Sequence, residues 1–178
     1  MINDALILMI PIVVGGVLHM LAVSKGWFRG LAVPINAKAF GPNKTWRGVF
    51  LMPALTLPGV LLLLWTSEHL APELFLTLSS VSPLVLGLGL GLGYILLELP
   101  NSCIKRRLRI PAGETPEKHA WFFLLFDQWD SAIGFALAYW LLTPLSVPLL
   151  ALMVLLFPLV ALAVKRLLYW ARWKEKKA

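Results

Sequence analysis

The chain has 178 residues, of which 59% are hydrophobic and only 14% charged, and its formal net charge is +7. A water-soluble domain of this size cannot hide so much apolar surface, so the composition excludes an ordinary soluble globular protein. The single cysteine, Cys103, excludes an intramolecular disulfide and a cysteine-based metal site. The composition therefore indicates an integral membrane protein.

Five apolar segments are long enough to cross a bilayer as helices, which takes about 20 residues each. In chain order they are Ala5–Val23, Val49–Trp65, Val81–Leu97, Trp121–Leu142 and Val147–Val164. They are apolar on all faces, whereas buried helices of a soluble protein show amphipathic stripes. The predicted fold is an all-α membrane bundle of about five helices, and we expect residues 1–178 to form one membrane-embedded domain.

All sixteen Lys and Arg residues fall into three clusters. The clusters occupy predicted loops at about 24–48 and 99–120 and a C-terminal tail at 165–178, whereas the connections 66–80 and 143–146 have no basic residue. Short loops rich in Lys and Arg face the cytoplasm. The sequence therefore predicts an N-terminus outside, a cytoplasmic C-terminus, and a multi-pass protein of the inner (cytoplasmic) cell membrane.

The third apolar segment has glycine at every second position, at Gly87, Gly89, Gly91 and Gly93. These residues form two overlapping small-xxx-small pairs, which let helix backbones approach closely in lipid. We expect them to pack helices together, either within the bundle or between subunits. A direct contact with a ligand is the alternative.

Asp127 and Asp130 lie inside the otherwise apolar fourth segment, where a charge costs about 2.5–3.5 kcal/mol near the bilayer centre. Residues three apart share a helix face, and a bound divalent cation would relieve their repulsion. Glu98, at the end of the third segment, is expected on the same side of the membrane. Three carboxylates would make the all-oxygen site that magnesium prefers. The alternative is a structural acid pair joined to a Lys or Arg of another helix.

Two basic motifs border these acids. The run Lys105–Arg107 follows Glu98 closely, and Lys44 and Arg47 share a face at the entrance of the second helix. Cations that hold phosphates beside a metal that neutralises charge are what a polyphosphate-handling enzyme requires. Basic residues next to a membrane can also do no more than set topology and attract anionic lipids.

These motifs resemble a known family. The chain has N-K-T-W-R-G at Asn43–Gly48, S-C-I-K-R-R at Ser102–Arg107 and D-Q-W-D at Asp127–Asp130, and is similar in these stretches to the CDP-archaeol synthases. It also looks like the larger CDP-diacylglycerol synthases, although Glu98 and Asn101 stand where those enzymes have Asp and Glu. The resemblance runs from about residue 40 to 135, in order and with suitable spacing.

The resemblance implies a CTP-dependent cytidylyltransferase of phospholipid biosynthesis, with Mg²⁺ as cofactor, CTP and a membrane lipid phosphate as partners, and no nucleic acid. It implies that Asp127, Asp130 and Glu98 hold the metal at a site facing the cytoplasm. Lys105 and Arg106 are then expected to act with the two aspartates in catalysis. The residues expected to bind the substrates are Asn43, Lys44, Arg47, Asn101, Ser102 and Arg107.

Two other functions remain as alternatives. A small transporter would use the carboxylates as a proton or cation site, but it needs polar residues along a path, and here the buried acids gather near one face. A non-catalytic scaffold would use the basic face alone and would not need the Asp127 and Asp130 pair. The acceptor lipid stays open between an ether-linked archaeal glycerol phosphate, phosphatidic acid and another isoprenoid phosphate.

Overall fold

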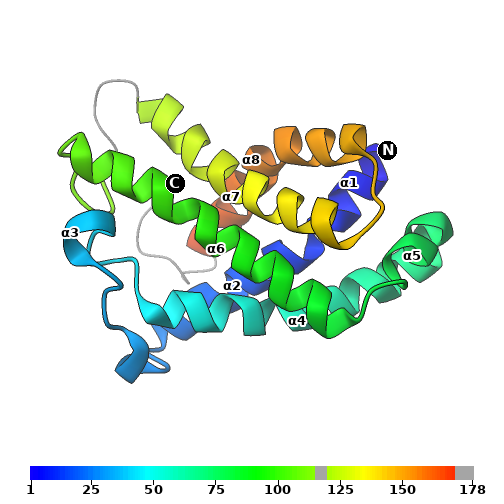
Figure 1. The fold of residues 1–178 in the computed structure, drawn as a ribbon, viewed down its shortest axis with the longest axis horizontal. Helices are drawn as coiled ribbons and strands as arrows, with labels where there is room; N and C mark the ends of the chain where they lie inside the picture. The colour runs from blue at the N-terminus through cyan, green and yellow to red at the C-terminus, as the bar shows by residue number, and fades with distance from the viewer. Residues whose placement is uncertain (115–119, 171–178) are drawn as a thin grey trace.

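The computed structural model describes residues 1–114 and 120–170, and helices account for most of this part of the chain. The α-helices are α1 (Ile2–Leu8), α2 (Ile10–Ser24), α3 (Ala37–Phe40), α4 (Trp46–Leu70), α5 (Pro72–Leu78), α6 (Pro83–Arg107), α7 (Ala120–Leu142) and α8 (Val147–Trp170), with a short 3-10 helix, η1, at Arg29–Leu31. The long helices lie alongside one another as a bundle (Figure 1). The predicted all-α fold is confirmed.

Four helical stretches within the described residues are long and apolar enough to cross a membrane: α1 with α2, then α4, α6 and α8. Helix α7 coincides with the fourth predicted segment and is 23 residues long, but it is not among these four. It carries the polar residues Asp127, Gln128 and Asp130. By length and composition, the chain is a multi-pass membrane protein, and its orientation in the membrane stays a prediction.

Several helices extend beyond the predicted segments. Helix α6 continues through Pro100 to Arg107, so the prediction that a loop begins at residue 99 is wrong. A proline is tolerated in a membrane helix when neighbouring groups satisfy the freed carbonyl. Helix α8 likewise continues past Lys165 to Trp170, and the end of α4 together with α5 fills most of the connection predicted at 66–80. The basic residues Lys105–Arg107 are therefore fixed on a helix.

The glycines of α6 bring it close to two neighbouring helices. A side-chain carbon added at Gly91 would overlap the backbone of Pro53 in α4, and one added at Gly93 would overlap the carbonyl of Gly134 in α7. A side-chain carbon added at Gly134 would likewise overlap the carbonyl of Gly93. The predicted packing role is confirmed, and the contacts lie within the bundle. Close approach of α6 and α7 places the polar stretch that ends α6 directly beside the acids of α7.

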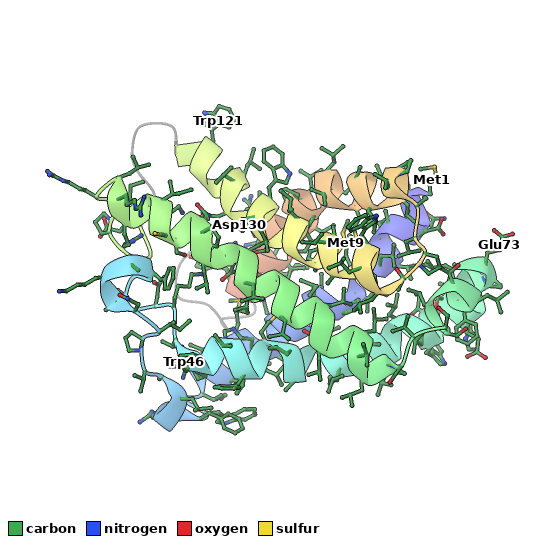
Figure 2. All side chains as sticks on the ribbon, viewed as in Figure 1. Met1, Met9, Trp46, Glu73, Trp121 and Asp130 are labelled. Carbon is green, nitrogen blue, oxygen red and sulfur yellow. The ribbon has the colours of Figure 1, made fainter. Side chains whose placement is uncertain are left out.

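The two ends of the bundle differ in chemistry. Helix α3, the end of α6 and the start of α7 lie at one end, and the N-terminus and α5 lie at the other (Figure 1). Figure 2 shows Asp130 on the ribbon between Trp121, at the first end, and Glu73, at the second. Helix α3 with Lys38 and the end of α6 with Lys105–Arg107 thus lie at the end of the bundle where α7 begins.

Candidate active site

A polar cavity of about 250 Å³ is formed by α3, the segment before α4, α6, α7 and α8. Most of the residues predicted from the sequence line it. They are Asn43, Lys44, Glu98, Asn101, Ser102, Lys105, Arg106, Asp127 and Asp130. The structure therefore brings together side chains from three parts of the chain that are far apart in the sequence.

One face of α6 supplies the centre of this site. Asn101 and Lys105 lie one helical turn apart and project toward α7. The Asn101 amide Nδ2 donates to Asp127 Oδ1 at 2.8 Å and to Asp130 Oδ2 at 2.6 Å. Lys105 Nζ lies 2.5 Å from each carboxylate oxygen of Asp127. Two side chains of α6 therefore hold the acid pair of α7 in place.

The ion pair of Lys105 with Asp127 matches the alternative drawn from the sequence, in which a basic residue of another helix neutralises the acids. Lys105 is only 8% exposed, so the pair is largely removed from water on the lysine side. A buried charge that lost its partner would be costly. The pair nevertheless lines an open cavity, where an incoming phosphate can compete with Asp127 for the lysine.

Glu98 lies beside the acid pair but has a different partner. Lys44 Nζ donates to Glu98 Oε2 at 2.5 Å. The Ser131 hydroxyl lies 3.2 Å from Glu98 Oε1 and 3.0 Å from Asp130 Oδ1, so it connects the two acids. Burial by itself opposes protonation of Lys44, but the Glu98 carboxylate outweighs it and raises the pKa of Lys44 above its ordinary value. Lys44 is therefore a fixed positive charge at neutral pH.

The segment before α4 holds Lys44 in position. The Ile35 amide donates to the Lys44 carbonyl at 2.9 Å, and the Trp46 amide donates to the Val33 carbonyl at 3.0 Å. These bonds surround an isolated bridge between Pro34 and Thr45. The loop predicted at residues 24–48 is thus ordered at the point where it contributes to the cavity.

The oxygen atoms at this site are of the kind that binds magnesium. Within residues 1–114 and 120–170, however, no three His, Cys, Asp or Glu side chains come together as a metal-binding group. Magnesium usually keeps several waters and takes one or two carboxylates together with substrate phosphates. Asp127 and Asp130 fit that kind of site, in which the metal binds together with a phosphate ligand. The three-carboxylate ligand set stays a prediction.

Two predicted residues lie elsewhere. Arg47 lines a second, larger cavity that shares Lys44 and Glu98 with the first. Arg107 lines a surface depression with Lys38 and Cys103, because the helix turns it away from most of the other site residues. A loop at this point would have allowed Arg107 to turn inward, but the extended helix α6 does not.

The cavity also contains residues that sequence reasoning missed. Lys165 was expected in a C-terminal tail, but it lies on α8 and lines the cavity. Phe40, Tyr94 and Gln128 line it as well. Gln128 could have been found from its place in the D-Q-W-D motif, whereas Tyr94 gave no signal within its apolar segment. His119, in the loop predicted at 99–120, lies outside the described residues.

Helix-borne cations that converge on the two aspartates of α7 indicate a class: a membrane protein that acts as an enzyme on phosphates. The model of the CarS-like CDP-archaeol synthase family matches residues 5–177. The chain belongs to this family, which makes it a cytidylyltransferase of lipid metabolism. No curated protein and no solved structure gave a significant match.

Proposed function

We propose that the protein transfers CMP from CTP to the phosphate of a membrane lipid. The convergence of Lys44, Lys105, Arg106 and Lys165 on the Asp127 and Asp130 pair in one cavity supports this proposal. An oxygen of the lipid phosphate attacks the α-phosphorus of CTP and forms a new phosphoanhydride bond. The bond from the α-phosphorus to the bridging oxygen breaks, and its electron pair leaves with pyrophosphate. The attacking oxygen is already anionic, so no strong general base is required.

The cavity favours the triphosphate as the part of CTP that it encloses. Its volume of about 250 Å³ lies below the range of roughly 300–1,000 Å³ that is typical for sites of larger ligands. We place the β- and γ-phosphates against Lys105 and Arg106. The Nε atom of Arg106 is buried and has no hydrogen-bond partner among the described residues. The cytosine ring then extends past the phosphates, and Phe40 offers it an aromatic face.

Asp127 and Asp130 are the residues that would hold magnesium, with Glu98 as a further ligand. When bound, the metal neutralises negative charge on the phosphates. Asn101 orients both aspartates through its amide, and Ser131 positions Glu98 beside Asp130. The chain's own contribution is thus to keep three acids near one another without allowing them to repel freely. We propose that this end of the bundle faces the cytoplasm, as its basic residues predict.

The test is pyrophosphate release by the purified full-length protein with CTP, magnesium and a panel of lipid phosphates. The panel includes an ether-linked isoprenoid glycerol phosphate and a phosphatidic acid. We expect CDP-lipid and pyrophosphate in equal amounts with at least one acceptor, and none when CTP or the lipid phosphate is left out. No turnover across the panel by a folded protein would contradict the proposed function.

A further inference from the structure

The larger cavity on the other side of Lys44 has no role in the site described above. It has a volume of about 770 Å³ and lies between α2, the segment that precedes α4, the start of α4, and α6. Its walls combine basic side chains with an apolar surface. The apolar residues include Met20, Val23, Ile35, Val49 and Ile95.

Two residues that line this cavity each have a buried polar atom without a hydrogen-bond partner in the described part of the chain. Among the described residues, neither His19 Nε2 nor Arg47 Nε has a hydrogen-bond partner. A buried unsatisfied polar group costs about 1–3 kcal/mol, and native proteins contain few of them. Both atoms belong to residues that line the same cavity. A ligand in the cavity that accepts hydrogen bonds would remove the cost if the two side chains rotate to expose these atoms to it.

The two side chains lie close to each other in space. A carbon added at Gly48 would lie 3.9 Å from His19 Nε2, so the ring sits beside the first turn of α4, next to Arg47. Arg47 Nη1 donates to the Trp27 carbonyl at 3.4 Å, a long contact that leaves other guanidinium N–H groups for a ligand. Lys44 completes a group of three basic side chains at the cavity. Glu98 also lines it, but this acid is neutralised by Lys44.

We propose that His19 and Arg47 bind the phosphate of the acceptor lipid in this cavity. The proposal rests on the function proposed above. Arginine matches a phosphate with two parallel hydrogen bonds, and an imidazole N–H adds a third donor. The apolar walls contact the carbons next to the headgroup, which free phosphate would leave unused. His19 is a binding residue that no sequence motif indicated.

The arrangement also explains how the two substrates meet. Asn43, Lys44 and Glu98 line both cavities, so the ion pair of Lys44 and Glu98 forms a shared wall. A phosphate held by Arg47 on one side and a nucleotide held by Lys105 on the other approach each other across this pair. Lys44 can then leave Glu98 and lie between the two anions, where it reduces their repulsion.

Steady-state kinetics in mixed micelles test the site, with the mole fraction of the lipid phosphate and the concentration of CTP varied separately. We expect His19→Leu and Arg47→Gln each to raise the KM for the lipid phosphate about tenfold, while the KM for CTP changes by less than about twofold. Arg47→Lys should recover part of the loss because it keeps the charge. The matched controls are His69→Leu and Arg29→Gln, which remove the same groups away from the cavity.

Lipid binding without turnover separates this inference from the proposed function. Native mass spectrometry of the full-length protein would compare phosphatidic acid with diacylglycerol, and an ether-linked glycerol phosphate lipid with its dephosphorylated form. We expect a preference for the phosphate forms that His19→Leu and Arg47→Gln abolish. If that result appears in a protein without turnover, the site stands and the proposed function fails. The proposed lipid-phosphate site would be overturned if both variants kept the preference for the phosphate forms, or if both kept the KM for the lipid phosphate unchanged.

Discussion

The two cavities on either side of Lys44 and Glu98 differ in how their charges are balanced. Each cavity is lined by an arginine whose Nε atom has no hydrogen-bond partner among the described residues, Arg106 in the smaller and Arg47 in the larger. The smaller cavity, however, also holds the Asp127 carboxylate with Lys105 and Asn101 as its partners, whereas the larger one has mainly apolar walls beside its basic side chains. A site for the reacting triphosphate needs charges that are already in position before the ligand binds. In the absence of the ligand, these charges must neutralise one another. A site for a lipid needs few donors, because the membrane already holds the rest of the molecule.

Removing a carboxylate of the acid pair should have the largest effect. Asp127→Asn keeps the shape of the side chain but removes its charge, so we expect CDP-lipid formation to fall by up to about 10³-fold. Lipid binding at the larger cavity should persist. Pyrophosphate release and native mass spectrometry measure the two effects. Asp4→Asn, near the N-terminus, is the control, and unchanged turnover in Asp127→Asn would remove this residue from the chemistry.

Separating α6 from α7 should disturb the smaller cavity more than the larger one. Gly134→Val forces a side chain against the carbonyl of Gly93, and a shift of about 1 Å at a reacting site can cost about 10²-fold in rate. We expect a loss of that size in kcat/KM for CTP, with a smaller change in lipid binding. Gly30→Val, where an added carbon meets nothing within 4 Å, is the control. If kcat/KM for CTP and lipid binding fell equally, the change would not act mainly on the smaller cavity.

The shared wall should affect both substrates. Lys44→Gln removes a charge that lines both cavities and leaves Glu98 without its ion-pair partner. We expect kcat/KM to fall about tenfold for each substrate, in contrast to the one-sided effect of Arg47→Gln. Lys38→Gln, in the same segment but outside both cavities, provides the comparison. An effect confined to one substrate would show that Lys44 serves a single cavity.

The smallest expected effect concerns the cytosine ring. Phe40→Leu removes an aromatic face at the edge of the smaller cavity, and stacking of a base on an aromatic side chain contributes about 1–3 kcal/mol. We expect the KM for CTP to rise about fivefold and the KM for the lipid phosphate to stay the same. Phe40→Trp should restore CTP binding. Equal kinetics in the leucine and tryptophan variants would place the base elsewhere.

Much of the fold and of the smaller site followed from the order of residues alone. Long apolar runs can satisfy their backbone in lipid only as helices, so composition and length were enough to predict the bundle. The acids at Asp127 and Asp130 were visible because a charge inside an apolar helix is costly. The glycines from Gly87 to Gly93 likewise indicated close helix packing before any neighbour was known.

Only the tertiary structure decided which groups meet. The continuation of α6 past Pro100 turned Lys105 toward Asp127 and Arg107 away from the smaller cavity, and neither outcome can be read from a basic cluster. His19 and Lys165 came into their cavities from α2 and α8 because helix packing brought distant segments together. Hydrophobicity along a chain fixes where helices form, whereas the contacts between their faces depend on three-dimensional packing. The sequence thus determined a membrane bundle with an acidic pair, and packing decided that two cavities share one ion pair.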